Sequence, residues 1–116
     1  MSYIIYHNPH CSKSRGTLQL LQDKGIEPEV IEYLKNPPSA DQIEKIIDLL
    51  AISAMDLVRT GEDEFKTCGL NSGSNDVEDV IQAIQACPIL LQRPIVIKDW
   101  QKAAIGRPPE NILTLL

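Results

Sequence analysis

Apolar and polar positions near the start of the chain form two short runs separated by a helical stretch. Residues 3–6 are apolar and rich in β-formers, and a run this short predicts a buried strand rather than a helix. Residues 7–9 carry a loop signal, and the helical stretch that follows ends at Gly25. Residues 30–34 alternate as a half-buried strand does. The chain therefore opens as strand, loop, helix and strand, with Cys11 in the loop or at the helix start.

The middle of the chain has the pattern of helices. Ser39 and Gln42 have the spacing of a capping box, and the apolar positions after them repeat as one helical stripe. That stripe is formed by Ile43, Ile46, Ile47 and Leu50. Ser53 and Asp56 indicate a second, short helix. Residues 61–75 are polar and contain glycine, which is typical of a loop.

A third helix of the middle region is predicted to begin near Asn75 and Glu78, which have a capping arrangement, and to end at Pro88. Its apolar stripe consists of Val77, Val80, Ile81 and Ile84. Residues 95–97 give the strongest strand signal in the chain, and a turn then leads to a partner strand over residues 102–105.

The last segment predicts a short helix that begins at residues 108–110 and carries Ile112, Leu113 and Leu116. The element order is then β-α-β, a helical insertion over about residues 39–87, and β-β-α. This order predicts an α/β protein with a thioredoxin-like fold. We expect a single domain over residues 1–116, with a small mixed four-stranded sheet and the helical insertion at its centre.

Length, composition and charge narrow the class of protein. The 116 residues are 43% hydrophobic and 23% charged, as in soluble globular domains, and the net charge of -5 argues against nucleic-acid binding. Three cysteines without a CxxC pair favour free thiols in a reducing compartment. The first residues lack a signal-peptide pattern, and no apolar run reaches the roughly 18 residues of a membrane helix. We therefore expect a soluble, cytoplasmic protein.

Cys11 is the first candidate for chemistry. A cysteine on a loop that leaves a buried strand and enters a helix lies near unpaired backbone amides, which favour the thiolate. Lys13, Arg15 and His7 are expected to act in the same direction, and the same amides could bind an oxyanion. The alternative is an inert structural thiol, which the polar and basic surroundings of Cys11 disfavour.

The other cysteines, Cys68 and Cys87, lack such surroundings, and a structural role is favoured for both. Ser14 stands where a dithiol motif would have its second cysteine, so a reactive Cys11 would need an external thiol such as glutathione. The histidines beside Cys11 do not have the spacing of a zinc site, and no second ligand cluster follows, so no metal is expected. No glycine-rich phosphate loop indicates a bound nucleotide cofactor.

Three arginines are candidates for recognising an anion, because arginine binds tetrahedral oxyanions in a bidentate geometry. Arg59 follows the predicted short helix, Arg93 directly precedes Pro94 and a strand, and Arg107 directly precedes Pro108. The alternative for each arginine is a solvated surface charge. Their positions at element junctions, where side chains often line a site, weigh against that alternative for Arg93 and Arg107. The Arg93–Pro94 bond is also a candidate for the cis form.

The chain resembles the glutaredoxin-linked arsenate reductases, a family of thioredoxin-like fold, in four segments. Residues 6–15 match H-N-P-x-C-x-x-S-R, and residues 57–62 match the middle arginine segment of that family. Residues 87–96 match P-x-L-L-x-R-P-I-V, and residues 105–110 match G-R-P-x-E. The four segments occur in the order of the family and span nearly the whole chain, so together they are specific although each alone is weak.

The resemblance implies a role for each matching residue. Cys11 would be the nucleophile that attacks arsenate. Substrate binding is assigned to the three arginines Arg59, Arg93 and Arg107. His7 would help to lower the pKa of the cysteine, and Ser14 and Arg15 would belong to the anion-binding loop. Glutathione would be the co-substrate, glutaredoxin would resolve the adduct, and no cofactor would be bound.

The hypothesis from the sequence is therefore a cytoplasmic, monomeric arsenate reductase that depends on glutathione and glutaredoxin. One alternative is a glutathione-dependent thiol oxidoreductase, in which Cys11 matters and the arginines do not. The other is a redox-sensing binding module that regulates a partner protein and binds it differently when Cys11 is oxidised.

Overall fold

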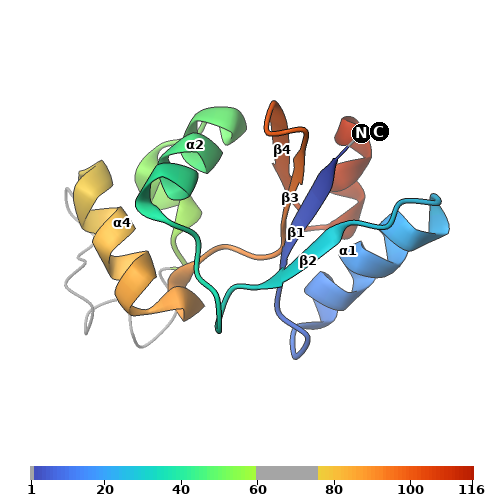
Figure 1. Cartoon of the computed structure of the whole chain (residues 1–116), viewed down its shortest axis with the longest axis horizontal. Coiled ribbons are helices and arrows are strands. Elements are labelled where there is room, and N and C mark those ends of the chain that lie inside the picture. Colours follow the sequence, from blue (N-terminus) through green and yellow to red (C-terminus); the bar gives the residue numbers. More distant parts are fainter. Residues whose placement is uncertain (1, 60–75) are drawn as a thin grey trace. The chain divides into compact units, whose positions relative to one another are not determined.

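The computed structural model describes residues 2–59 and 76–116 and contains one mixed four-stranded sheet (Figure 1). The strand order is β2-β1-β3-β4. The first two strands are parallel, and the β1–β3 and β3–β4 pairs are antiparallel. The strands are β1 (Tyr3–His7), β2 (Glu29–Glu32), β3 (Ile95–Lys98) and β4 (Lys102–Ile105). The expected α/β class and the small mixed sheet are confirmed.

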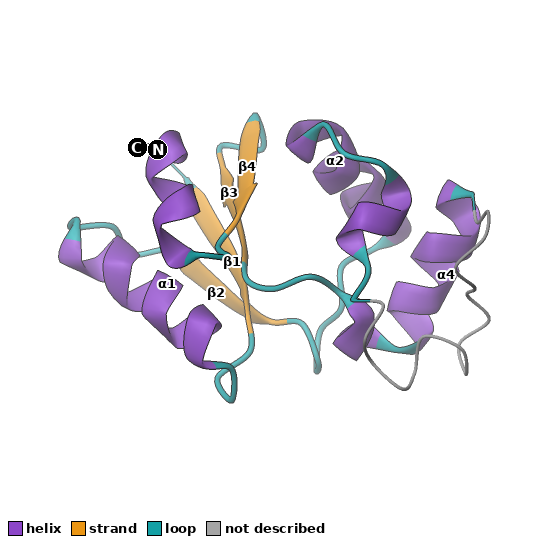
Figure 2. Cartoon of the chain, turned by 180° about the vertical axis from the view of Figure 1, so that it is seen from behind, coloured by secondary structure: helices purple, strands orange, loops and turns teal. Residues whose placement is uncertain are grey.

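Two helices cover the same face of this sheet, as seen in Figures 1 and 2. They are α1 (Ser12–Asp23) and the 3-10 helix η3 (Pro109–Leu115). The cluster between them and the sheet is formed by buried side chains from β1, α1, β3 and η3: Ile5, Leu21, Val96, Ile112 and Leu115. Because β1 and β3 are anchored by this cluster, the loops that leave their ends start from rigid positions.

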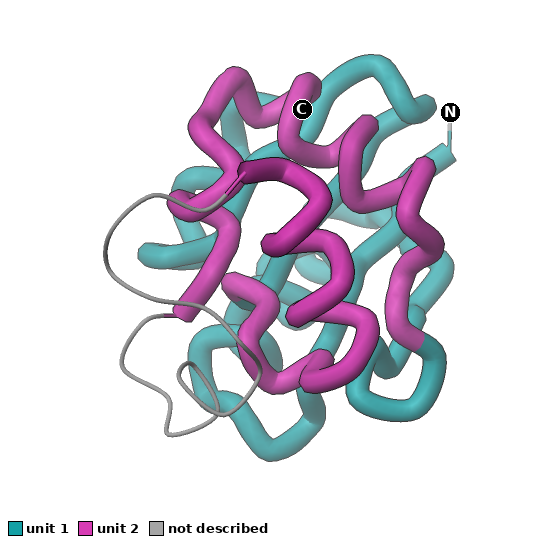
Figure 3. Tube along the Cα trace, turned by 90° about the vertical axis from the view of Figure 1, so that its left-hand side faces the viewer, with its two compact units in different colours: residues 1–36, 93–116 teal, residues 37–92 magenta. Residues whose placement is uncertain are grey.

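The chain divides into two compact units, which Figure 3 marks by colour. Unit 1 contains residues 1–36 and 93–116 and therefore the whole sheet, and unit 2 contains residues 37–92. Among its described residues, unit 2 contains the helical elements α2 (Ala40–Leu50), η1 (Ala54–Leu57), α4 (Val77–Ala86) and η2 (Pro88–Leu90). The expected insertion over about 39–87 falls within this unit.

The helices α2 and α4 are stabilised by buried apolar stripes and by capping boxes. Ile43, Ile46 and Ile47 are buried on one face of α2, which begins with the predicted capping box of Ser39 and Gln42. The helix α4 buries the stripe Val80, Ile81, Ala83 and Ile84. An isolated antiparallel bridge between Val58 and Leu91 connects the segments after η1 and η2.

Several predicted element boundaries are wrong. The second strand ends at Glu32 rather than residue 34, because Tyr33 and Leu34 enter a turn. The capping box of α4 is formed by Asp76 and Asp79, one residue beyond the predicted pair. Asn75, like the predicted loop over 61–75, lies outside the described residues. The final helix is a 3-10 helix in which Leu115 is buried, while Leu113 and Leu116 are exposed.

The expectation of free thiols holds for one cysteine and fails for another. Cys11 is a free thiol, which confirms the expectation for this residue. Cys87 is disulfide-bonded, so the expectation of a free thiol is wrong there, since sequence spacing does not show which residues meet in space. Cys68 lies outside the described residues. Within the described ranges, no helix is long and apolar enough to cross a membrane.

Candidate functional site

The loop between β1 and α1 is held by its own backbone. The Cys11 amide donates to the Asn8 carbonyl (3.0 Å), and the His10 amide donates to Asn8 Oδ1 (3.0 Å). Arg15 Nη1 donates to the Pro9 carbonyl (2.9 Å) from the first turn of the helix. These bonds turn the chain sharply between strand and helix, and they place Cys11 at the position before the first helical residue.

Cys11 is the N-cap of α1, with the extended backbone that this position requires (φ -100°, ψ 122°). Its carbonyl accepts the first helical bond from the Arg15 amide (3.0 Å). In the described part of the chain, no side-chain acceptor of full hydrogen-bond geometry caps the first amides of α1. The half-buried thiol therefore stands beside amide groups that a conventional cap would have occupied.

The surroundings of Cys11 favour its thiolate. Burial raises the pKa of the thiol, but the Ser14 amide, the Arg93 side chain and the Lys13 amide lower it by more. The net result is a pKa below the ordinary value for cysteine. Amide groups at a helix start and a nearby guanidinium are the environment in which reactive cysteines occur. Cys11 therefore has more thiolate character than an ordinary cysteine, which makes it a candidate nucleophile.

Ser14 connects the strand, the loop and the helix. It is fully buried on the inner face of α1, and its Oγ lies 2.7 Å from His7 Nδ1 and accepts from the Asn8 amide (3.0 Å). Burial lowers the pKa of His7, while Glu32 raises it and Arg15 lowers it, with a net decrease. The lowered pKa favours the neutral form of the His7 ring, and the Ser14 hydroxyl holds that ring by the hydrogen bond to Nδ1.

The strand pairing places Arg93 and Arg107 at the end of the sheet where β1 ends. Tyr6 near the end of β1 pairs with Ile95 at the start of β3, and Ile95 pairs with Ile105 at the end of β4. Arg93 precedes this row by two residues, and Arg107 follows it by two. The Arg93 side chain reaches Cys11, whereas Arg107 is exposed. Both arginines are followed by cis prolines, and Pro94 was the candidate for this form in the sequence.

Gly106 holds the two arginine segments close to α1. Its amide donates to the Pro94 carbonyl (2.8 Å), and its carbonyl oxygen lies 3.4 Å from the Thr17 hydroxyl. A Cβ atom at Gly106 would lie 2.5 Å from Thr17 Oγ1 and 2.9 Å from Pro94 Cγ. No side chain fits in this space, so glycine is required for the close approach of the three segments.

The other predicted site residues have different surroundings. Arg59 belongs to unit 2, where its amide donates to the Leu90 carbonyl (2.7 Å) beside the Val58–Leu91 bridge. Arg15 supports the loop through Pro9 and is exposed. His7 contacts Ser14 and is not among the groups that lower the pKa of Cys11.

Tyr33 is a residue of the site that the sequence did not reveal. Glu32 pairs with His7 in the sheet, so the next residue, Tyr33, lies beside Asn8 at the same end. Its side chain is completely buried, and its phenol interacts with Arg93, Asn8 and Cys11. In the sequence, Tyr33 had the pattern of an ordinary strand residue. No signal distinguished it from the other buried tyrosine, Tyr6.

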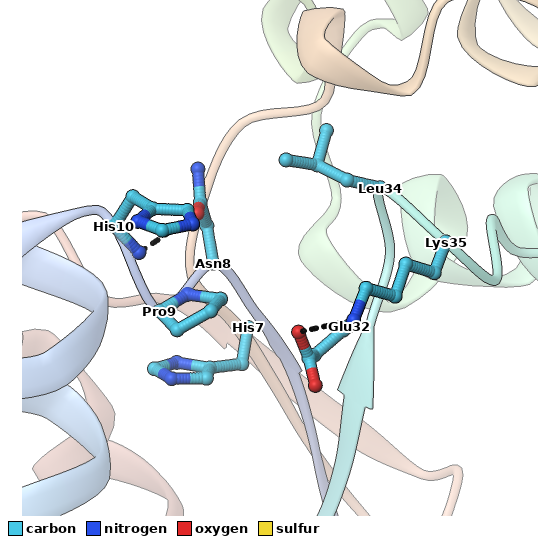
Figure 4. A pocket seen from close by; sticks show the side chains of 7 residues that line it. All are labelled: His7, Asn8, Pro9, His10, Glu32, Leu34 and Lys35. Atoms are coloured by element: carbon cyan, nitrogen blue, oxygen red, sulfur yellow. Dashed lines mark hydrogen bonds and ion pairs between the residues drawn. The ribbon is translucent and has the colours of Figure 1, made fainter.

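A small pocket lies behind the cysteine loop, between residues 7–10 and the end of β2 (Figure 4). Leu34 and Lys35 face the loop across it, and the His7 ring points away from the Glu32 carboxylate. Its volume of about 110 Å³ is well below the several hundred Å³ of a usual ligand pocket. The described residues contain no cluster of histidine, cysteine and acidic groups that could hold a metal ion.

A family profile, related sequences and solved structures all match the chain over nearly its full length. The sequence profile of the ArsC family matches residues 6–115. An "Arsenate reductase" of Neisseria meningitidis is 43% identical over 97% of this chain and 96% of its own length. "Uncharacterized protein YfgD" of Escherichia coli K12 is 46% identical over 97% of this chain and 94% of its own length. The solved structure "Arsenate reductase from Vibrio cholerae" matches with a TM-score of 0.93 and 38% identity, over 100% of this chain and 98% of that one.

Proposed function

The chain belongs to the ArsC family, and from this membership and the geometry of the site we propose that it is an arsenate reductase with Cys11 as its nucleophile. Relatives that cover nearly all of the chain are named arsenate reductases. One observation carries the proposal: a free thiol of lowered pKa stands at an uncapped helix start with a guanidinium beside it. This arrangement supplies a nucleophile and a place for an oxyanion together.

The first step is the attack of the Cys11 thiolate on arsenic. An oxygen of arsenate leaves as water, and a sulfur–arsenic bond replaces it. Since both reactants are negatively charged, their approach is opposed by repulsion, which the Arg93 guanidinium and the first amides of α1 offset. Arg107, at the same end of the sheet, and Arg59, in unit 2, are proposed as further ligands of the oxyanion.

The remaining steps need two electrons from thiols outside the chain. Glutathione displaces a second oxygen as water and forms its own sulfur–arsenic bond. A thiolate of glutaredoxin then attacks the glutathione sulfur, a disulfide forms between the two, and the electron pair of the broken bond reduces arsenic from +5 to +3. Water releases arsenite from Cys11 and restores the thiol. No bound cofactor is required, and a monomer in the cytoplasm, where glutathione is abundant, suits this cycle.

A coupled assay tests the proposal. NADPH consumption is followed with arsenate, glutathione, glutaredoxin and glutathione reductase, for the wild type and for Cys11→Ser and Arg93→Ala. We expect arsenate-dependent turnover that disappears in Cys11→Ser and falls sharply in Arg93→Ala. An exposed lysine of α2 gives a matched control, Lys45→Ala, which should keep wild-type activity.

The assay also separates the alternatives. A wild type without arsenate-dependent turnover would contradict the proposal. Activity on protein mixed disulfides, with Arg93→Ala unaffected, would then favour a thiol oxidoreductase. Partner binding that changes on oxidation of Cys11, without turnover, would favour a regulatory module.

A further inference from the structure

Tyr33 lies at the end of the sheet where the Cys11 loop begins. Three segments converge where β1 ends: the cysteine loop follows β1, Tyr33 follows β2, and Arg93 precedes β3. The strand register therefore brings Tyr33, Asn8 and Arg93 to one end of the sheet by backbone geometry alone. Tyr33 is 0% exposed, so its ring has one fixed position in this cluster.

The Tyr33 hydroxyl is buried without a hydrogen-bond partner of full geometry among the described residues. A buried polar group in that condition destabilises the folded protein, and native structures contain few of them. Residues that retain such a group often serve a function that offsets the loss of stability. The Tyr6 hydroxyl shares this condition, so the groups around the Tyr33 hydroxyl are what distinguish it.

The groups around the hydroxyl belong to the site. Burial raises the pKa of Tyr33, the Arg93 charge and the Asn8 amide lower it, and a Cys11 thiolate raises it. The net effect is an increase, so the phenol stays protonated and neutral near pH 7. A neutral oxygen with its lone pairs beside Arg93 attracts the guanidinium without neutralising its charge.

We propose that Tyr33 is a positioning residue that holds the Arg93 guanidinium toward Cys11. Because solvent does not reach the hydroxyl, a bound oxyanion would not touch it either, and its influence has to pass through Arg93. Arg93 interacts with both Tyr33 and Cys11, so an effect of Tyr33 on its guanidinium reaches the sulfur. The consequence for arsenate rests on the proposed function, whereas the consequence for the Cys11 thiolate does not.

The test is Tyr33→Phe, which keeps the ring and removes only the hydroxyl. The matched control is Tyr6→Phe: Tyr6 is also buried with an unpartnered hydroxyl among the described residues, but its phenol interacts with Glu29. The readout is the pH dependence of Cys11 alkylation by iodoacetamide, which follows the thiolate fraction. Thermal unfolding of each variant is measured in parallel.

We expect the alkylation midpoint of Tyr33→Phe to rise by about half a unit to one unit, because a less well-oriented guanidinium stabilises the thiolate less. Tyr6→Phe should leave the midpoint unchanged. In an Arg93→Ala background, Tyr33→Phe should cause no further rise, since its effect passes through Arg93. Stability should change little, because the cost of burying the hydroxyl opposes folding while its attraction to Arg93 favours it.

Each other outcome overturns the proposal. An unchanged midpoint in Tyr33→Phe would show that the hydroxyl does not orient Arg93, and a fall in stability alone would assign it a structural role. An equal rise in Tyr6→Phe, or an additive rise in the Arg93→Ala background, would also contradict it. The KM for arsenate should increase several-fold in Tyr33→Phe; if the wild type does not reduce arsenate, the proposed function fails while the alkylation result still decides the role of Tyr33.

Discussion

The first amides of α1 are hydrogen-bonded differently from the first amides of α2 and α4. Every helix begins with amides that have no partner within the helix. In α2 the Ser39 hydroxyl and in α4 the Asp76 carboxylate accept from these amides, and both helices complete a capping box. In α1 the corresponding position is occupied by Cys11, whose thiol makes no capping bond of full geometry within the described residues.

Charge differs between these helix starts in the same sense. The first turn of α2 carries Asp41, and that of α4 carries Glu78 and Asp79, which suit the positive end of a helix dipole. The first turn of α1 carries Lys13 and Arg15 instead. These cations oppose the dipole in the free protein and attract an anion that binds there. The helices α2 and α4 are therefore stabilised at their starts, while the start of α1 is left able to bind an anion.

The comparison predicts its largest effect for Cys11→Ser. Serine is a good N-cap and a poor nucleophile, so arsenate reduction should fall by at least about 10³-fold while the free energy of unfolding rises by about 0.5–1 kcal/mol. Activity is followed in the coupled assay and stability by urea unfolding. A less stable Cys11→Ser protein would show that the thiol stabilises the fold, and the contrast between the helices would then be wrong.

Arg93→Ala should have the next largest effect. Loss of a charged group that stabilises the developing oxyanion lowers kcat/KM by about 10²–10³-fold. Arg93→Lys should recover only part of this loss, because lysine lacks the planar fork of arginine. If Arg93→Lys matched the wild type, the guanidinium geometry would be irrelevant and only the positive charge would matter.

Ser14→Ala would disturb the support of α1 rather than its reactive end. The change leaves His7 Nδ1 and the Asn8 amide without their buried partner, so we expect a loss of about 1–3 kcal/mol in stability. The exposed neighbour gives a matched control, Ser12→Ala, which should change stability by less than about 0.5 kcal/mol. Equal stability of the two variants would show that the hydrogen bonds of Ser14 do not stabilise the fold.

Ser39→Ala tests the conventional cap of α2. It should destabilise the protein by about 1 kcal/mol through loss of the capping box, and Ser39→Asp, which keeps an acceptor, should restore most of that stability. The KM for arsenate should not change in either variant. A change in KM would mean that the caps of unit 2 also act on the site.

The smallest expected effect is a pH dependence from His7. Its pKa in the folded protein is below the ordinary value of 6.5, so the unfolded chain binds more protons between these two values. Stability from this group is therefore complete above pH 6.5 and is lost as the pH falls through the folded pKa. Unfolding midpoints measured between pH 5 and 8 should show this decrease in the wild type and a weaker one in His7→Gln. Parallel curves for the two proteins would contradict the assignment.

Much of the fold could be predicted from the sequence because its signals are local. The stripe from Ile43 to Leu50 and the apolar run over residues 95–97 each bury one face or one strand, and this periodicity is visible in the chain. The predicted boundaries were wrong where two neighbouring residues suit the same position or where a strand pattern continues into a turn. Asn75 and Asp76 are both good caps, and Tyr33 continues the alternation of β2 although its backbone turns.

The site was predictable only where chemistry and local structure coincide. Cys11 stood out because a strand, a loop and a helix start are all recognisable around it. Tyr33 was missed because its position depends on segments that are distant in sequence. The free thiol expected at Cys87 was wrong, because spacing along the chain does not show which cysteines meet. The partner of Arg93 likewise follows from the antiparallel pairing of β3 with β1, which no local pattern encodes.

The amides at the start of α1 and the Arg93 side chain together lower the pKa of Cys11. The most direct test is the thiolate absorbance at 240 nm as a function of pH, taken as the difference between the wild type and Cys11→Ser. We expect a single titration with a midpoint below the ordinary cysteine value of about 8.5, and a higher midpoint in Arg93→Ala. A midpoint at or above about 8.5 in the wild type would contradict it.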